Sequence, residues 1–307
     1  MDIFLQQIIN GLTLGSVYAV VALGYTMVYG IIQLINFAHG EVVMIGAMVA
    51  FSVITTLVGT ALPPLLIVFA GILAAVPVCM LVGYAMERIA YRPLRGAPRL
   101  APLITAIGIS IILQHAALLV WSRNPLAFPQ IIPLASFEVG GAIITGVQIA
   151  IILTSVLMMG GLTLLVYRTR LGIAMRATSQ NPQIAGLMGI DIDRIIAFTF
   201  IVGAALGAVA GVMVGTYYGI AHYSMGSLLG LKAFSAAVLG GIGNLAGAML
   251  GGILLGIVEA LGAGYIGDLT DNVFGSNYQD VFAFLVLIAV LVFRPSGLLG
   301  ERVGDRA

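Results

Sequence analysis

Residues 8–30 read IINGLTLGSVYAVVALGYTMVYG, and no charged side chain occurs between Asp2 and Glu41. A helix of about 20 predominantly apolar residues is long enough to cross the hydrocarbon core of a bilayer. The preceding residues, 1–7, lack the basic segment that opens a cleavable signal peptide. We therefore expect residues 8–30 to stay in the chain as a membrane-spanning helix.

The rest of the chain repeats this pattern. Of its 307 residues, 61% are hydrophobic and 8% are charged, whereas a soluble domain carries about 25% charged residues. No charged segment is long enough to fold alone, so we expect one transmembrane domain over 1–307. An apolar piece at 231–243 is too short to span and is expected to be a short or re-entrant helix. The predicted fold is all-α: a polytopic transmembrane helical bundle with discontinuous helices and about eight spans, near 8–30, 41–60, 65–86, 101–121, 145–167, 195–218, 246–265 and 278–293.

The basic residues predict the orientation. Eleven of the 13 lie in three segments, 88–99, 168–194 and 294–306. Because cytoplasmic loops carry the excess of Lys and Arg, we place all three segments inside the cell. The N-terminus is then outside, the C-terminus is inside, and the number of crossings must be odd. Eight spans violate that parity and nine satisfy it if 231–243 crosses, so both counts stay open.

Several function classes are excluded. A net charge of +1 argues against nucleic acid as a partner. The only lysine, Lys232, does not lie in a GxxxxGK[ST] loop, so this chain cannot hydrolyse ATP in the P-loop manner. No catalytic triad or metal-ligand spacing occurs, and Cys79 is expected to be a buried packing residue. We therefore expect no enzyme and no cofactor in this chain, with energy coming from a partner or an ion gradient.

A glycine-rich stretch, LGGIGNLAG at 239–247, nearly matches a dinucleotide-binding fingerprint. That motif requires a preceding strand, which an apolar helical context does not provide. We expect instead a break between two half-helices, which a membrane protein tolerates against protein or a water-filled cavity.

Polar residues also interrupt the apolar pattern at INFAHGEVVMIG, 35–46. Asn36, His39, Gly40 and Glu41 predict a helix break with Asn36 as a cap. They are candidates for the translocation path; the alternative is an ordinary tight cytoplasmic turn. Glu259 is a further candidate because a lone carboxylate within a span costs about 2.5–3.5 kcal/mol; the alternative is a helix-end residue that reaches the outer interface.

The segment RLGIAMRATSQNPQIAGLMGID, 170–191, lies in the middle basic loop. Ser179 or Asn181 can cap a helix with Pro182 early in it. Gly189 can end that helix. Apolar residues recur on one face, so we expect a short amphipathic helix that docks into a groove of another protein or rests on the membrane surface. The face comprises Ile184, Leu187 and Met188.

Small residues mark a packing face. Gly203, Gly207, Gly211 and Gly215 recur at every fourth position, which lets another helix approach closely. The seam could belong to a moving channel, or it could be ordinary membrane packing.

Together these segments resemble the branched-chain amino acid permease family of ATP-binding cassette (ABC) importers, specifically the LivH type. The matching stretches are GLTLGSVYA from Gly11, GYTMVYGII from Gly24, INFAHGE from Ile35, ERIAYRPLR from Glu87, residues 170–191, and KAFSAAVLGGIG from Lys232.

The resemblance implies a bacterial inner-membrane complex. A LivM-like second permease would complete the pore. Two cytoplasmic ATPases, which hold ATP and Mg²⁺, would dock on the coupling loop 168–194. A periplasmic binding protein would deliver leucine, isoleucine or valine. The implied docking positions are Arg176, Ala177, Asn181, Ala185 and Gly189.

Other functions stay open. Related permeases for urea or short amides are not separated by these motifs, nor is a homodimer separated from a heterodimer. An ion-coupled secondary carrier would need a coupling carboxylate such as Glu259. A passive channel would need no energy source.

Overall fold

The computed structural model describes residues 2–98, 100–132, 136–269 and 278–300. Within them, seven helices are long and apolar enough to cross a membrane, and two shorter apolar helices join them. Seven of the eight predicted spans are confirmed, with ends shifted by a few residues, and the eighth, 278–293, is one of the shorter helices. The long helices are α1 (Asp2–Ile32), α2 (His39–Leu57), α3 (Pro64–Ala85), α4 (Leu100–Val120), α5 (Gly146–Arg168), α8 (Ile192–Tyr218) and α10 (Leu245–Leu269), and the shorter ones are α9 (Met225–Gly240) and α11 (Gln279–Phe293).

Two small antiparallel sheets lie at one end of the bundle. β1 (Leu126–Ala127) pairs with β4 (Ile220–Ala221). β2 (Ser136–Val139) pairs with β3 (Ala142–Thr145) through a two-residue turn, Gly140–Gly141. Both turn glycines have positive φ, 61° and 85°, as a tight hairpin turn requires. No strands were predicted from the sequence here, since such short strands carry too little alternation to detect.

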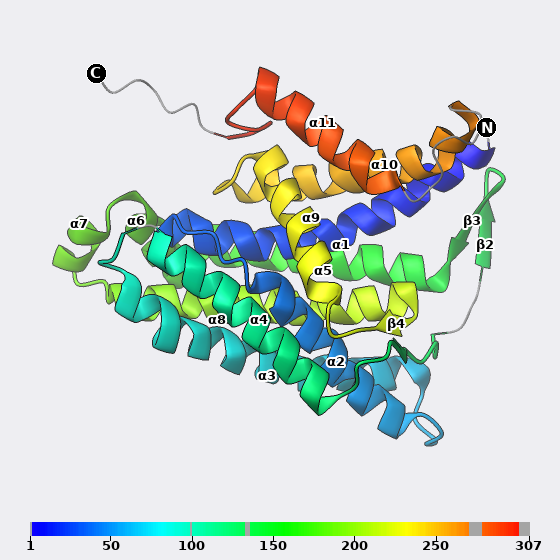
Figure 1. Ribbon diagram of the computed structural model, residues 1–307, viewed down its shortest axis with the longest axis horizontal. Coiled ribbons are helices and arrows are strands. Elements are labelled where there is room, and N and C mark those ends of the chain that lie inside the picture. The colour runs from blue at the N-terminus through cyan, green and yellow to red at the C-terminus, as the bar shows by residue number, and fades with distance from the viewer. Residues whose placement is uncertain (1, 99, 133–135, 270–277, 301–307) are drawn as a thin grey trace.

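The opposite end carries the arginine-bearing segments. Helices α6 (Arg170–Gln180) and α7 (Pro182–Leu187) project there, far from the β2–β3 hairpin (Figure 1). α3 also ends there, in a π-helical turn, Met86–Tyr91, and a 3₁₀ turn, Arg92–Leu94. We call this the arginine end and the opposite one the hairpin end.

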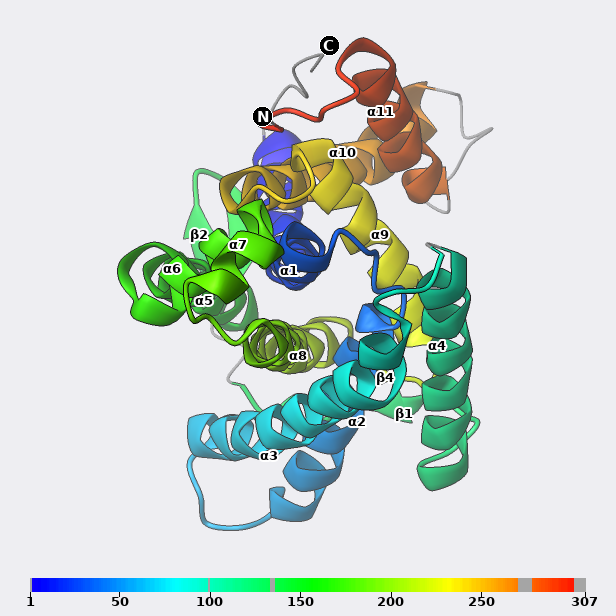
Figure 2. The same cartoon turned by 90° about the vertical axis from the view of Figure 1, so that its left-hand side faces the viewer.

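Helix α1 is the centre of the fold. It contacts α5, α8, α9 and α10, while α4 stands at the periphery (Figure 2). Glycines let α1 and α10 approach closely: a Cβ added at Gly15 would lie 2.6 Å from the Cα of Ile253. A Cβ at Gly11 would lie 2.6 Å from the Cα of Ile257. Close backbone approach of this kind is how membrane helices pack without a hydrophobic driving force between them.

The predicted short helix is α9, which begins at Met225 rather than near 231. Its 16 residues are about 24 Å long at 1.5 Å per residue, less than the roughly 30 Å of a bilayer core. It ends at Gly240, and Gly241 and Gly243 follow with φ of 108° and 95° before α10 begins. The predicted glycine-rich break is therefore confirmed.

Candidate functional site

Helix α2 begins inside the bundle, not at its end. A Cβ added at Gly24 of α1 would collide with the His39 ring, and one at Gly207 of α8 would lie 3.5 Å from His39 Cε1. Gly24 precedes the end of α1 by eight residues, about 12 Å of helix, and Gly207 lies near the middle of α8. Residues 33–38 are not helical and return into the interior (Figure 1). The predicted helix break is confirmed, and the tight-turn alternative is wrong.

Asn36 stabilises the unwound segment, but it is not the cap of α2. Its Oδ1 accepts hydrogen bonds from the Ala38 backbone N–H at 3.1 Å and from the Tyr91 hydroxyl at 2.9 Å. The N-cap position is Ala38, which makes no side-chain cap bond. The prediction of Asn36 as a cap is therefore wrong. The side chain satisfies buried backbone and a neighbouring helix instead, because unwound backbone inside a bundle needs partners.

Glu41 is fully buried, and one of its two carboxylate oxygens is hydrogen-bonded. Its Oε1 accepts hydrogen bonds from Gln114 Nε2 at 2.7 Å and Ser110 Oγ at 3.1 Å, both from α4. Its Oε2 finds no hydrogen-bond partner among the described residues. A Cβ added at Gly226 would lie 2.6 Å from that oxygen, so the open side of the carboxylate faces the start of α9.

The first turns of α2 and α9 meet at this carboxylate. A Cβ at Gly226 would also lie 2.5 Å from the Gly40 carbonyl oxygen, and Gly230 lies against the Gly40 Cα. Both helix N-termini carry partial positive charge. α2 and α9 thus both begin beside Glu41, and helix N-termini placed at an interior site bind anionic substrate groups in many transporters.

Aromatic rings close the space around this meeting point. Tyr25 of α1 contacts His39 edge-on with ring centroids 4.8 Å apart. Phe234 of α9 lies 6.0 Å from Tyr25 and 5.8 Å from Phe37, centroid to centroid. His39 Nε2 is buried and has no hydrogen-bond partner within the described part of the chain. The site thus combines a buried carboxylate oxygen, a buried imidazole and aromatic surface, in which Tyr25 is buried and the two phenylalanines are half-buried.

A second buried polar cluster lies on the other side of α9. Lys232 Nζ lies 2.7 Å from Glu259 Oε1 and 2.6 Å from Asp280 Oδ1. The Tyr18 hydroxyl donates to Glu259 Oε2 at 3.0 Å. Glu259 is fully buried near the middle of α10, so the alternative of a helix-end residue at the outer interface is wrong. The cluster joins α1, α9, α10 and α11, and its pairing was not predicted from the sequence.

The coupling loop folds as two helices rather than one. Thr169 caps α6 by accepting from the Gly172 N–H. Asn181 caps α7 by accepting from the Ile184 N–H, with Pro182 at the first position. Ser179 caps nothing, because its hydroxyl donates to the Arg176 carbonyl oxygen. Of the two predicted caps, Asn181 is confirmed and Ser179 is wrong.

Gly189 ends this segment as predicted. It has φ of 87°, and the Ile190 N–H donates to the Ala185 carbonyl oxygen across the turn. The predicted apolar face is exposed: Leu187 and Met188 are 87% and 79% exposed. Ala185, in contrast, is 3% exposed and faces the bundle. The exposed face, not Ala185, is the surface available to a partner.

The other implied docking positions lie nearby. Ala177 is half-buried on α6. The Arg176 guanidinium lies over the Tyr167 ring, 5.3 Å from its centroid.

The predicted glycine face of α8, Gly203 to Gly215, contacts α1, α2 and Phe128. A Cβ added at Gly211 would lie 2.7 Å from the Ala47 backbone nitrogen.

An ion cluster ties the arginine end together. Arg92 and Arg95 both bind Asp193 at the start of α8, and Arg95 also binds Glu87. Glu87 is fully buried. Asp193 lies near the end of the coupling loop 168–194, so the cluster links that loop to the end of α3. No local spacing in the sequence joins residues about 100 positions apart, and the cluster was not predicted.

Comparison with known proteins gives consistent results. The family described as "Branched-chain amino acid transport system / permease component" matches residues 7–291. The chain is 50% identical over 303 residues to the high-affinity branched-chain amino acid transport system permease protein BraD of Pseudomonas aeruginosa, covering 97% of this chain and 96% of that protein. It is 45% identical, with the same coverage, to the permease protein LivH of Escherichia coli K12. The probable branched-chain amino acid transport permease protein LivH of Methanocaldococcus jannaschii is 28% identical over 97% of this chain and 94% of its own length. No solved structure matches the chain.

Proposed function

This chain belongs to the family of branched-chain amino acid transport permeases, and we propose that it forms half of the membrane path of an ATP-driven importer for leucine, isoleucine and valine. It is a permease component and not an enzyme. A LivM-like permease completes the path in this proposal, two cytoplasmic ATPases supply energy from ATP and Mg²⁺, and a periplasmic binding protein delivers the amino acid.

The exposed apolar tip of α7 carries the proposal. Leu187 and Met188 lie at the arginine end, where the described part of the chain leaves most of both side chains exposed. A short helix with an exposed apolar face suits insertion into a groove of another protein. Because the chain holds no P-loop, an external ATPase that grips this tip can supply the movement. The loop 168–194 is then a coupling element within one permease domain, and Arg176, Ala177, Asn181, Ala185 and Gly189 shape or flank the docking surface.

We place the translocation path at the meeting of α2 and α9. Gly40 and Gly226 allow the two helices to touch, and a sliding movement between them would uncover Glu41 and His39. A zwitterionic amino acid needs an acceptor for its ammonium group and donors for its carboxylate. Glu41 Oε2 supplies the first, and the helix N-termini supply the second. Asn36 holds the unwound segment that makes this geometry possible.

A secondary carrier is the second candidate, since Glu259 is a buried carboxylate. Both of its oxygens are already bonded, to Lys232 and Tyr18. We therefore assign Glu259 to holding α9 in place, and the ABC importer remains the better proposal. In this proposal the complex lies in the inner membrane, the arginine end faces the cytoplasm, and the N-terminus lies on the periplasmic side.

The docking assignment is tested by aspartate substitutions at the α7 tip. Leu187→Asp with Met188→Asp should leave the permease inserted but weaken ATPase association and leucine uptake at least about tenfold, the loss of about 1.4 kcal/mol of contact. Co-purification of the ATPases with the solubilised permease and uptake in cells are the measurements. Phe137→Asp, at an apolar position that is 54% exposed in the β2–β3 hairpin at the other end, should leave both unchanged. Full ATPase association by the α7 variant would overturn the assignment.

A further inference from the structure

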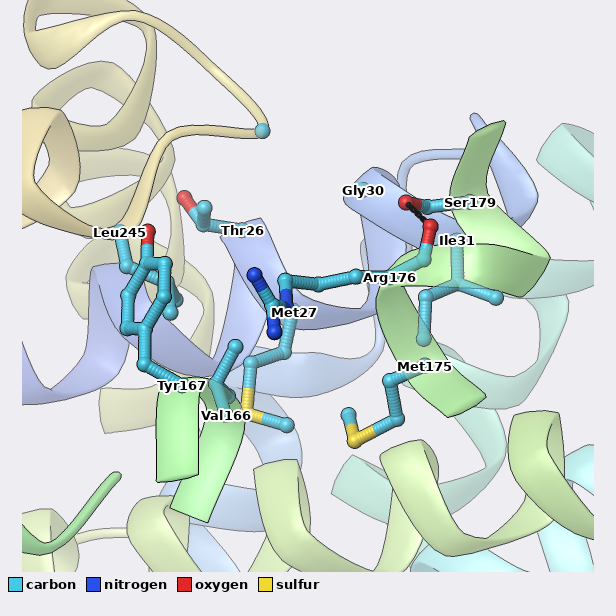
Figure 3. A pocket seen from close by; sticks show the side chains of 11 residues that line it. Thr26, Met27, Gly30, Ile31, Val166, Tyr167, Met175, Arg176, Ser179 and Leu245 are labelled. Carbon is cyan, nitrogen blue, oxygen red and sulfur yellow. Dashed lines mark hydrogen bonds between the residues drawn. The ribbon is translucent and has the colours of Figure 1, made fainter. Parts of the chain in front are cut away.

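A cavity of about 180 Å³ opens at the arginine end, between the coupling loop and the bundle. Its walls come from α1, the end of α5, α6 and the turn that leads into α10 (Figure 3). It lies apart from the Glu41 and Lys232 clusters, since neither contributes a lining residue. A cavity of roughly 150 Å³ is known to hold benzene, so this one is large enough for a small organic molecule.

The walls of the cavity are amphipathic. Met27, Ile31, Val166, Met175 and Leu245 form an apolar surface. Figure 3 shows the Arg176 side chain extending from α6 toward the Tyr167 ring, beside this surface. Among the described residues that line the cavity, Arg176 is the only basic one.

Thr26 adds an unsatisfied hydroxyl to the wall. A threonine within a helix usually donates its hydroxyl to the carbonyl four residues earlier. The buried Thr26 Oγ1 makes no hydrogen bond with any described residue. Its hydroxyl is thus available to hydrogen-bond a ligand in the cavity. The usual bond is made in this chain by Thr13, Thr163, Thr178, Thr199 and Thr216.

These groups match one chemical class. A single guanidinium pairs with one carboxylate, whereas the apolar wall suits a branched aliphatic side chain. The free Thr26 oxygen can accept a hydrogen bond from an ammonium group. We infer that the cavity binds a free branched-chain amino acid from the side of the arginine end. The inference rests on the proposed function, because it makes the transported molecule the ligand.

Such a ligand would act on coupling. It would touch α6, α1 and the turn before α10 at once, and so hold the coupling loop against the bundle. A ligand that binds more tightly to one position of α6 stabilises that position. It therefore slows every step of the transport cycle in which α6 must move. Accumulated amino acid would therefore slow its own import from the product side.

The inhibition is tested with the whole transporter in proteoliposomes. The ATPases face outward, the leucine-loaded binding protein is inside, and ATP hydrolysis is measured while leucine is added outside. We expect hydrolysis to fall by about tenfold, within the usual range of coupling between sites. Each rate is expressed relative to the same variant without external leucine. Hydrolysis that never responds to external leucine would overturn the inference while leaving stimulation by the binding protein, and hence the proposed function, intact.

A filling variant locates the effect. A Cβ added at Gly30 on the cavity wall would lie 3.7 Å from its nearest neighbour, the Gly243 carbonyl oxygen, which is ordinary contact. Gly30→Leu should therefore place its side chain in the cavity and abolish the inhibition. Gly160→Leu on α5 adds the same bulk where a Cβ meets nothing within 4 Å, and it should keep the inhibition. Equal inhibition in both variants would overturn the cavity assignment.

A direct binding measurement tests the cavity independently of transport by the complex. Equilibrium dialysis of radiolabelled leucine against the detergent-solubilised transporter should show a site that Gly30→Leu removes and Gly160→Leu retains. Isoamylamine, which lacks the carboxylate, and octanoate, which lacks the ammonium group, should not displace the leucine. Displacement by octanoate would mean a lipid-like carboxylate site and would overturn the assignment to an amino acid. Leucine binding that is unchanged in Gly30→Leu would overturn it as well.

Discussion

Lys232 and Glu259 form a buried ion pair, with 2.7 Å between Nζ and Oε1. Asp280 completes the contacts of the lysine from α11, and Tyr18 holds the second oxygen of Glu259 from α1. A charge inside a membrane bundle is expensive without a partner. The only lysine of the chain is thus held by groups from α10 and α11, and the cluster fixes the short helix α9 against the rest of the bundle.

Removing one charge of this pair should lower the free energy of unfolding more than removing both charges. Lys232→Met leaves Glu259 buried and uncompensated, which costs about 3–5 kcal/mol. Lys232→Met combined with Glu259→Gln removes both charges and should recover a large part of that loss. Thermal and denaturant unfolding of the solubilised permease measure the effect.

The same variants distinguish a structural Glu259 from a coupling carboxylate. If the residue only holds α9, the double variant should recover leucine uptake together with stability. Uptake that stays abolished in a stable double variant would contradict the structural role and favour the secondary carrier. Purely additive losses in the double-mutant cycle would show that the pair has no interaction energy.

The contact between α2 and α9 leaves no room for a methyl group. Gly226→Ala places its Cβ 2.6 Å from Glu41 Oε2 and 2.5 Å from the Gly40 carbonyl oxygen. The two helices must separate, and overpacking of this kind costs about 1–3 kcal/mol. We expect leucine uptake to fall about tenfold or more, because 1.4 kcal/mol is a factor of ten.

A matched glycine on α4 controls for the added methyl group. A Cβ at Gly108 meets nothing within 4 Å, so Gly108→Ala should leave uptake and stability unchanged. Normal uptake by Gly226→Ala would show that the α2–α9 contact does not lie on the translocation path.

The spans of this fold could be predicted because membrane helices need long uncharged runs. The breaks between them, such as Pro63–Pro64 at the start of α3 and Gly241–Gly243 before α10, are local signals. The start of α9 was missed by six residues because His222, Tyr223 and Ser224 are too weakly polar to mark a helix boundary. The β1–β4 pairing is non-local, and two-residue strands leave no periodicity.

The site could be predicted only in part. Asn36, His39 and Glu41 stand out because polar groups between apolar runs are costly. Their partners do not, since Ser110 and Gln114 lie about 70 positions away and are ordinary in composition. The pairing of Lys232 with Glu259 and Asp280 likewise depends on how α9 crosses the bundle, which no local pattern encodes.

The ion cluster at the arginine end contains one buried acidic side chain, Glu87, and one partly exposed acidic side chain, Asp193. Arg95→Gln leaves the fully buried Glu87 without its cation, and we expect a loss near the buried-pair range of about 3–5 kcal/mol. Asp193→Asn removes contacts between side chains that are 25–42% exposed, and exposed pairs contribute about 1 kcal/mol or less.

The ranking of the two variants is the test. Unfolding midpoints of the solubilised permease should drop clearly for Arg95→Gln and little for Asp193→Asn. Glu87→Gln added to Arg95→Gln should restore part of the loss. An equal effect of the two single variants would show that the link to Asp193, rather than the burial of Glu87, dominates this cluster.

Chemical labelling can establish which side of the membrane the arginine end faces. The native Cys79 is buried, and Cys79→Ala gives a background without thiols because the chain has no other cysteine. Leu187→Cys places a thiol at the α7 tip, and Ile143→Cys places one on the hairpin at the opposite end. In intact cells, a membrane-impermeant maleimide should label Ile143→Cys alone, and Leu187→Cys should react only after permeabilisation. Co-expressed ATPases should then protect Leu187→Cys and leave Ile143→Cys unprotected, since only α7 is proposed to enter their groove. Labelling of Leu187→Cys in intact cells would reverse the orientation and remove the coupling loop from the reach of any cytoplasmic ATPase.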